Sequence, residues 1–171
     1  MLLIFAGLPG TSKSALARAL APRLNATILD KDLVRQAMFG PHRITFTTEQ
    51  DDVVIDTMLR SAADIFRENP SASVIIDGRV FSRNSQLKHV TDFADSIPTR
   101  WLVVECTCSE AFAKRRLVAD IGKHIAANRT PELYDRVKER FQPIPEPKLV
   151  INTEQPLEVC VELALSSIQQ K

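Results

Sequence analysis

Short apolar runs alternate with longer stretches of mixed apolar and polar residues along the chain. The apolar runs cover residues 2–6, 27–29, 73–76, 101–106 and 149–151. The stretches with helical periodicity cover residues 13–20, 33–39, 49–68, 85–95, 110–120, 131–141 and 156–169. Five short strands separated by helices are typical of repeated βα units, so the pattern predicts an α/β domain with a parallel sheet.

Local signals mark several helix starts. Thr48 and Ser109 are candidate caps of the third and fifth helices, and Pro131 and Pro156 suit first-turn positions. Residues 121–130 have little apolar periodicity, and we expect an irregular segment there. The proline-dense residues 143–147 are short and predict a stiff connection into the last strand rather than a linker between domains.

The stretch GLPGTSKS, residues 7–14, follows the first apolar run directly. It nearly matches the phosphate-binding pattern G-x-x-x-x-G-K-[S/T], with Ser12 in place of the second glycine. A strand, a glycine-containing turn and a helix start place backbone N–H groups around one concavity that suits a phosphate. Lys13 would reach the terminal phosphates and the Ser14 hydroxyl would ligate Mg²⁺. The alternative is a chance match in an ordinary βα turn. The candidate nucleotide-binding residues are Gly7, Pro9, Gly10, Thr11, Ser12, Lys13 and Ser14.

Two carboxylates and an arginine follow the second predicted strand. Asp30 and Asp32 come at its end, and Arg35 lies one helical turn later. Ligands of open α/β sheets collect at the carboxyl ends of the strands, so these side chains should face the same crevice as the loop. We expect Asp32 to be the base for a hydroxyl acceptor, Asp30 to assist the metal through water, and Arg35 to grip the acceptor. An acidic helix cap followed by an exposed ion pair is the alternative interpretation.

The third predicted strand ends in Ile76-Asp77-Gly78. This order resembles the Walker B arrangement, in which a strand-end carboxylate reaches the metal's outer shell or a substrate hydroxyl. Arg79 and Arg83 follow, and either is a candidate for binding an anionic acceptor. A strand that ends in Asp-Gly is also a common turn, so the signal is weak by itself.

Three arginines lie in or beside the irregular segment. Arg115, Arg116 and Arg129 are candidates for lid cations that stabilise a transferring phosphoryl group, with Arg116 and Arg129 favoured. Surface arginines on a helix are more often simply solvated.

Composition limits the remaining classes of function. The 171 residues are 44% hydrophobic and suit one domain. The formal charge of +1 argues against an extended nucleic-acid or membrane surface. Three cysteines without metal-ligand spacing are typical of a reduced, cytoplasmic protein, and the apolar start is too short for a signal peptide. His42, His89 and His124 show no metal-binding or nucleophilic pattern.

Taken together, these motifs resemble those of small P-loop kinases of the nucleoside-monophosphate-kinase type. The nearest group is the bacterial ATP-binding proteins labelled predicted kinases, which are related to polynucleotide kinase and chloramphenicol phosphotransferase; residues 126–134 look like that group in particular. Asp32-x-x-Arg35 matches the polynucleotide kinase pattern, in which the aspartate acts on the acceptor hydroxyl, and Asp30-x-Asp32 is similar to shikimate and gluconate kinases. Ser12 is the main departure from the family's pattern.

The resemblance implies a three-layer P-loop NTPase fold, with a five-stranded parallel sheet of order 2-3-1-4-5 and helices on both faces. It also implies an acceptor-binding flap at about residues 39–69 and a lid at about 116–131. ATP and Mg²⁺ are the expected cofactors.

The leading functional hypothesis is a phosphotransferase that moves the γ-phosphate of ATP to a hydroxyl of a small-molecule or nucleotide-like acceptor. A switch GTPase is disfavoured because no N/T-K-x-D motif is present, and a remodelling ATPase would need a larger module. The rival hypothesis is a catalytically weak ATP-binding regulatory protein in which Ser12 marks lost activity.

Overall fold

The computed structural model describes residues 1–122 and 129–169. Within these residues, five strands form one parallel sheet in the order β2-β3-β1-β4-β5, as the resemblance implied. The strands are β1 (Leu2–Ala6), β2 (Ala26–Asp30), β3 (Ser73–Asp77), β4 (Trp101–Thr107) and β5 (Lys148–Asn152). The helices are α1 (Lys13–Leu24), α2 (Lys31–Phe39), η1 (Pro41–Arg43), α3 (Thr48–Glu68), α4 (Asn84–Asp95), α5 (Glu110–Ala119), α6 (Pro131–Lys138) and α7 (Leu157–Gln169).

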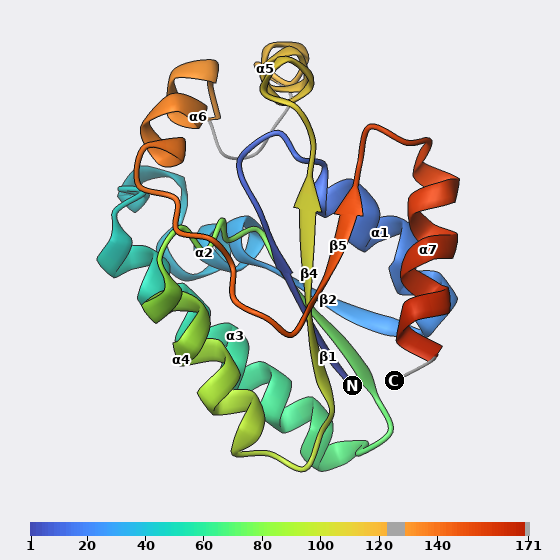
Figure 1. Ribbon diagram of the computed structural model, residues 1–171. Helices are drawn as coiled ribbons and strands as arrows, with labels where there is room; N and C mark the ends of the chain where they lie inside the picture. Colours follow the sequence, from blue (N-terminus) through green and yellow to red (C-terminus); the bar gives the residue numbers. More distant parts are fainter. Residues whose placement is uncertain (123–128, 170–171) are drawn as a thin grey trace.

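Helices cover both faces of the sheet and make three layers (Figure 1). Helices α3 and α4 pack on one face, and α1 and α7 pack on the other. Helices α5 and α6 lie beyond the carboxyl ends of the strands, at the top of Figure 1. The carboxyl end of the sheet is therefore enclosed by elements that come from distant parts of the sequence.

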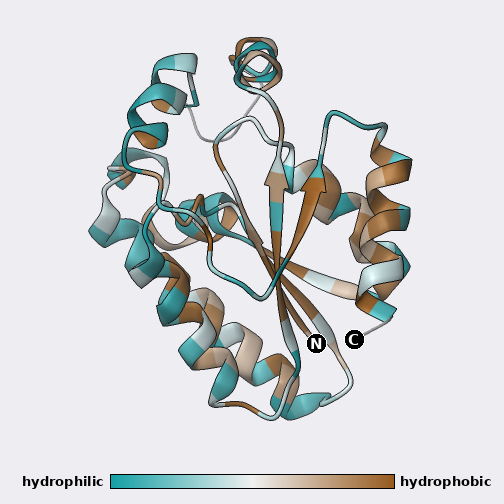
Figure 2. Ribbon diagram, in the orientation of Figure 1, coloured by the Kyte–Doolittle hydropathy of each residue, from teal (hydrophilic) through white to brown (hydrophobic). Residues whose placement is uncertain are grey.

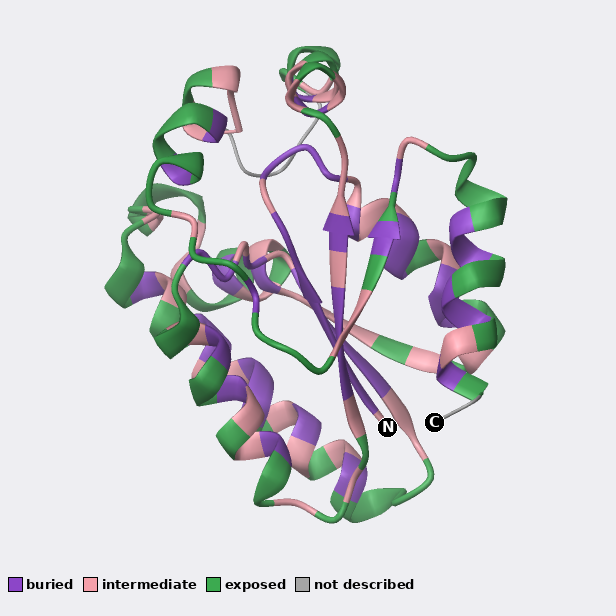
Figure 3. Cartoon of the chain, viewed as in Figure 1, coloured by how far each residue is buried: buried purple, intermediate pink, exposed green. Residues whose placement is uncertain are grey.

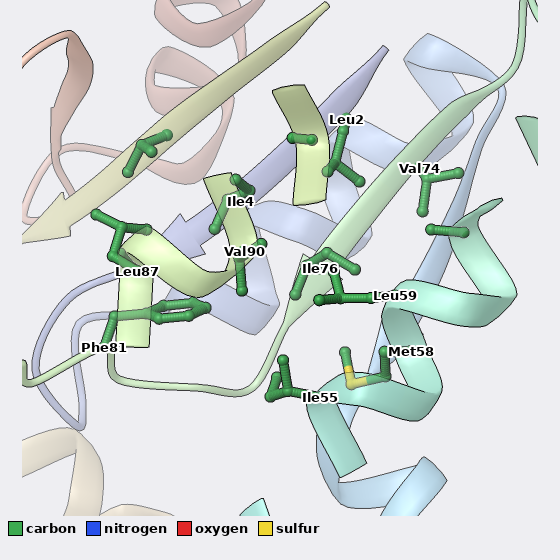
Figure 4. Close-up of a cluster of buried hydrophobic side chains, with 14 of the residues drawn as sticks. Leu2, Ile4, Ile55, Met58, Leu59, Val74, Ile76, Phe81, Leu87 and Val90 are labelled. Carbon is green, nitrogen blue, oxygen red and sulfur yellow. The ribbon is translucent and has the colours of Figure 1, made fainter. Parts of the chain in front are cut away.

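The sheet contributes alternate residues to two separate cores. Leu2 and Ile4 of β1 face α3 and α4, whereas Leu3 and Phe5 face α1 and α7. Figure 4 shows the first core, where Ile55, Met58 and Leu59 of α3 meet the sheet. Because β1 is central and buried on both faces, it consists of apolar residues without alternation. Figures 2 and 3 show the same distribution, with apolar and buried residues concentrated in the central strands.

Three details of the predicted elements differ from the structure. The third helix is capped by Thr47, whose hydroxyl accepts from the Gln50 N–H, so the prediction of Thr48 was wrong by one residue. The first helix continues past residue 20 to Leu24 despite Pro22. The sixth helix ends at Lys138 rather than at residue 141, shortly before the proline-dense segment.

Two of the three other predicted helix starts agree with the structure. Pro131 occupies the first turn of α6, as expected. Ser109 is the cap residue of α5, as predicted, although its side chain makes no capping hydrogen bond. Pro156 lies one residue before α7, which begins at Leu157, so the prediction of a first-turn position was wrong by one residue. The Pro156 carbonyl oxygen accepts from the Cys160 N–H.

No helix in residues 1–122 and 129–169 has both the length and the apolar character needed to cross a membrane.

Candidate active site

The loop between β1 and α1 depends on two glycines. Gly7 and Gly10 have φ values of 131° and 78°. A Cβ atom on Gly7 would lie 2.3 Å from the Cys106 carbonyl oxygen, and one on Gly10 would lie 2.5 Å from the Ala113 carbonyl oxygen. The loop is thus wedged between the end of β4 and helix α5, and a side chain at either glycine would push it out of place.

Ser12 also has a left-handed backbone, with φ 56° and ψ 26°. The glycine that the usual pattern has here supplies this conformation without strain, whereas an L-residue costs about 1–2 kcal/mol. The Ser12 carbonyl accepts from the Leu16 N–H at 3.0 Å and so begins α1 normally. The serine therefore preserves the path of the loop at a local conformational cost.

Lys13 bends back over the loop. Its Nζ donates to the carbonyl oxygens of Gly7 and Leu8, both at 2.8 Å, and the residue is only 8% exposed. Burial lowers the Lys13 pKa to about 8, and the nearby cations Arg129 and Lys31 act in the same direction. An ammonium group held among carbonyls and other cations is well placed to bind an anion.

Asp77 ends β3, directly beside Asp30 in the register of the sheet. It is 1% exposed, and its Oδ1 has no hydrogen-bond partner. Burial raises the Asp77 pKa, and hydrogen bonding by the Ser14 hydroxyl opposes that shift. A buried carboxylate oxygen without a partner, next to a hydroxyl, fits a hydrated Mg²⁺ ion.

Within the described residues, no group of three or more His, Cys, Asp and Glu side chains could hold a metal by itself. The donors at this site are the Asp77 carboxylate and the Ser14 hydroxyl. They suit Mg²⁺, which proteins commonly bind with one or two carboxylates and substrate phosphates. Asp30, the other predicted metal residue, caps α2: its Oδ1 accepts from the N–H groups of Asp32 and Leu33, at 2.9 and 3.3 Å.

Asp32 belongs to a network of four charged side chains. Its Oδ1 accepts from Arg35 at 2.6 Å. Asp51 of α3 binds Arg35 through one carboxylate oxygen and Lys31, at 3.0 Å, through the other. Arg35 is 2% exposed and lies over the ring of Phe46, 5.2 Å from its centroid. The predicted Asp32–Arg35 pair thus forms, but the Arg35 guanidinium is buried and is also bound to a second helix.

The remaining predicted arginines have different surroundings. Arg79 is buried and pairs with Asp52 at 2.5 Å. Arg116 donates to the hydroxyl and carbonyl oxygens of Thr153. Arg83 and Arg129 line the cavity described below. Arg115 stacks on Phe112, 4.3 Å from its centroid, and does not line that cavity.

One cavity of about 550 Å³ joins the loop, α2, the residues after β3, and helices α5 and α6. Among the described residues that line it, nine are basic and three are acidic, although the whole chain has a formal charge of only +1. The basic residues are Lys13, Arg18, Lys31, Arg35, Arg79, Arg83, Arg116, Arg129 and Arg140. The fold therefore concentrates positive charge that the composition does not reveal.

Sequence reasoning missed five of the charged residues at this site, one of which is Asp120 at the end of α5. Asp51 had the ordinary appearance of a first-turn acid of a long helix, and Arg140 that of a polar helix end. Lys31 and Arg18 likewise matched no motif in their segments. No local pattern marks these positions, because each becomes part of the site only when separate elements pack together.

The family model described as "AAA domain" (AAA_33) matches residues 2–144. Curated proteins gave no match. Several solved structures share the fold.

The Mycobacterium tuberculosis APS kinase CysC, solved with AMPPNP and APS, is 15% identical with a TM-score of 0.77, covering 98% of this chain and 96% of that chain. A gluconokinase from Sinorhizobium meliloti 1021 is 16% identical with a TM-score of 0.67, covering 98% and 91%. Chaetomium thermophilum Kti12, in complex with ADP-AlF3, is 12% identical with a TM-score of 0.72, covering 99% and 98%. At these identities the similarity establishes a P-loop kinase-like fold.

Proposed function

The chain belongs to the AAA-domain family AAA_33, and from that membership and the geometry of the cavity we propose that the protein is an ATP- and Mg²⁺-dependent phosphotransferase. The acceptor is a hydroxyl of a small molecule or nucleotide-like compound. One observation carries the proposal: a carboxylate, Asp32, lines the same positively charged cavity as the phosphate loop. Transfer to a hydroxyl needs a carboxylate beside the bound triphosphate to orient the acceptor or take its proton.

The loop and its lysine would hold the triphosphate. The backbone N–H groups at the start of α1 would bind phosphate oxygens, and Lys13, which donates to two carbonyl oxygens in this structure, would donate to the phosphates instead. Ser14 and Asp77 would hold Mg²⁺, which would offset the charge that develops on the transferring phosphoryl group. Arg116 and Arg129 line the cavity near the loop and are proposed to stabilise the transferring group.

Asp32 is the proposed base. The acceptor oxygen attacks the γ-phosphorus, the bond from that phosphorus to the bridging oxygen of ADP breaks, and the acceptor proton passes to the Asp32 carboxylate. Arg35, at 2.6 Å, fixes the orientation of that carboxylate. Arg35 itself has little free surface, so in this structure it serves to position Asp32, and contact with the acceptor would require the network to open.

The flap and lid remain proposals. Residues 39–69 include Phe46 and Asp51, which line the cavity. The lid, at about 116–131, includes Arg116 and Arg129; residues 123–128 of it lie outside the described part of the chain. Both segments border the cavity, so their closure over bound substrates would exclude water from the reaction.

The test is a transfer assay with γ-labelled ATP, Mg²⁺ and a panel of hydroxyl acceptors, comparing the wild type with Asp32→Asn. We expect at least one acceptor to be labelled, the variant to transfer about 10²–10⁴-fold more slowly, and ATP affinity to stay within a few-fold. Asp64→Asn, on the exposed side of α3, is the control. If ATP binds and no acceptor is labelled, the regulatory-protein hypothesis replaces this one.

A further inference from the structure

The nine cations of the cavity are not all available to a ligand. Lys31 and Arg35 share the carboxylate of Asp51, and Arg79 is paired with Asp52. Within residues 1–122 and 129–169, none of the other six forms an ion pair. These six are Lys13, Arg18, Arg83, Arg116, Arg129 and Arg140.

Four of these six cations define two zones of the cavity. Lys13 forms the first with Arg129, whose charge is close enough to lower the Lys13 pKa. Arg140 lies beyond the other end of α6 from Arg129, and that eight-residue helix is about 12 Å long. The triphosphate of a nucleotide would use the first zone, which leaves the cations of the second without an assigned ligand.

Arg83 belongs to the second zone with Arg140, because hydrogen bonds made by Gln142 hold the two chain segments side by side. The Gln142 N–H donates to the Ser82 carbonyl oxygen at 2.9 Å, and the Asn84 N–H donates to the Gln142 Oε1 at 2.7 Å. Arg83 lies between the two hydrogen-bonded positions, and Arg140 lies two residues before Gln142. Both side chains are exposed and line the same cavity, so a bound anion could contact both.

The chemistry of two guanidinium groups favours a phosphate over a carboxylate. One guanidinium can satisfy a carboxylate through two parallel hydrogen bonds. Two guanidinium groups supply twice the charge and four or more donors, which match a phosphate monoester with three terminal oxygens and a charge of about −1.5 to −2. The pair is therefore suited to a dianion.

We propose that Arg83 and Arg140 bind a phosphate group already present on the acceptor, so that the substrate is a phosphorylated hydroxyl compound. The role of the bound molecule as a phosphoryl acceptor rests on the proposed function. The existence of a phosphate site at Arg83 and Arg140 does not depend on that function. Arg83 and Arg140 would determine specificity, while Asp32 would act on the hydroxyl of the same molecule.

The experiment measures the binding of inorganic phosphate by calorimetry to protein saturated with Mg²⁺ and AMPPNP, which blocks the loop. We expect one phosphate per chain, at least tenfold weaker binding of acetate, and at least tenfold weaker phosphate binding in Arg83→Gln and in Arg140→Gln. Arg136→Gln, an exposed position on α6 that does not line the cavity, should bind phosphate as the wild type does.

The same titration in a Lys13→Ala background separates this inference from the proposed function. If AMPPNP fails to bind to the wild-type protein, the proposed function is in error. Phosphate binding to the Lys13→Ala protein still reports on the second zone in that case. No phosphate binding in either background, equal binding of acetate, or phosphate affinity unchanged in both arginine variants would each overturn the inference. Thermal melts check that the exposed substitutions leave the fold intact.

Discussion

The two halves of the cavity are built by different means. In the loop half, backbone conformation and close packing set the geometry, because Gly7 and Gly10 are pressed against the carbonyl oxygens of β4 and α5. In the acceptor half, ion pairs between α2 and α3 set the geometry, with Asp51 bound to both Lys31 and Arg35. The first half is therefore sensitive to added atoms, and the second to removed charge.

The largest effect is expected in the acceptor half. In Asp51→Asn the buried Arg35 guanidinium loses a counter-charge, and removal of one partner from such a pair costs about 3 kcal/mol of unfolding free energy. Urea denaturation measures this. Asp64→Asn removes an exposed pair on the same helix and should cost less than about 1 kcal/mol. Equal losses in the two variants would mean that the network is no more than a surface feature.

In the loop half, Gly10→Ala should weaken nucleotide binding by roughly 30-fold, corresponding to about 2 kcal/mol of overpacking against Ala113. Gly40→Ala is a matched control, because Gly40 also has a positive φ of 66° but no atom within 4 Å of the added Cβ. Equilibrium binding of a fluorescent ATP analogue compares the two. The packing explanation fails if the control variant loses as much affinity as Gly10→Ala.

A smaller effect should come from pH. The lowered pKa of Lys13, about 8, means that its ammonium form predominates below pH 8 and is lost above it. Because a bound phosphate favours the ammonium form, nucleotide affinity should be nearly constant up to about pH 7.5 and fall roughly eightfold by about pH 9. Lys13→Arg keeps its charge over this range, so its affinity should be flat. An equal slope in both proteins would assign the titration to another group.

The smallest effect is expected for Ser12→Gly. Glycine removes the strain of the left-handed conformation but increases the entropy lost on folding, and these terms of about 1 kcal/mol nearly cancel. Unfolding free energy should change by less than about 0.5 kcal/mol, and nucleotide affinity by less than about twofold. A large gain in turnover would show that the serine restrains the loop during the reaction.

Much of the fold could be predicted because it is local in the sequence. The five strands were found to within one or two residues, since each is a short apolar run between helical patterns. The order of the strands does not follow from such runs, and only the resemblance to P-loop kinases predicted it. The error at Thr48 is also local, because Thr47 and Thr48 are chemically identical candidates for the same cap.

The predicted site residues fall into two groups for a related reason. The loop residues follow β1 directly and Asp77 ends β3, so parallel pairing alone gathers them at one edge of the sheet. Arg35 and Arg79 were expected to contact an acceptor, but both are buried and pair with acidic residues of α3. Whether these two arginines are free to bind an acceptor depends on α3, which lies outside the short motifs that contain them.

The sequence by itself determined the strand pattern, the phosphate-loop motif and the strand-end carboxylates, because each depends on neighbours a few positions away. Only the tertiary structure decided that Asp51 restrains Arg35, that Arg140 lines the same cavity as Arg83, and that a nearly neutral chain has a strongly cationic cavity. Charges interact through space, and folding brings together residues whose separation along the chain gives no sign of their contact.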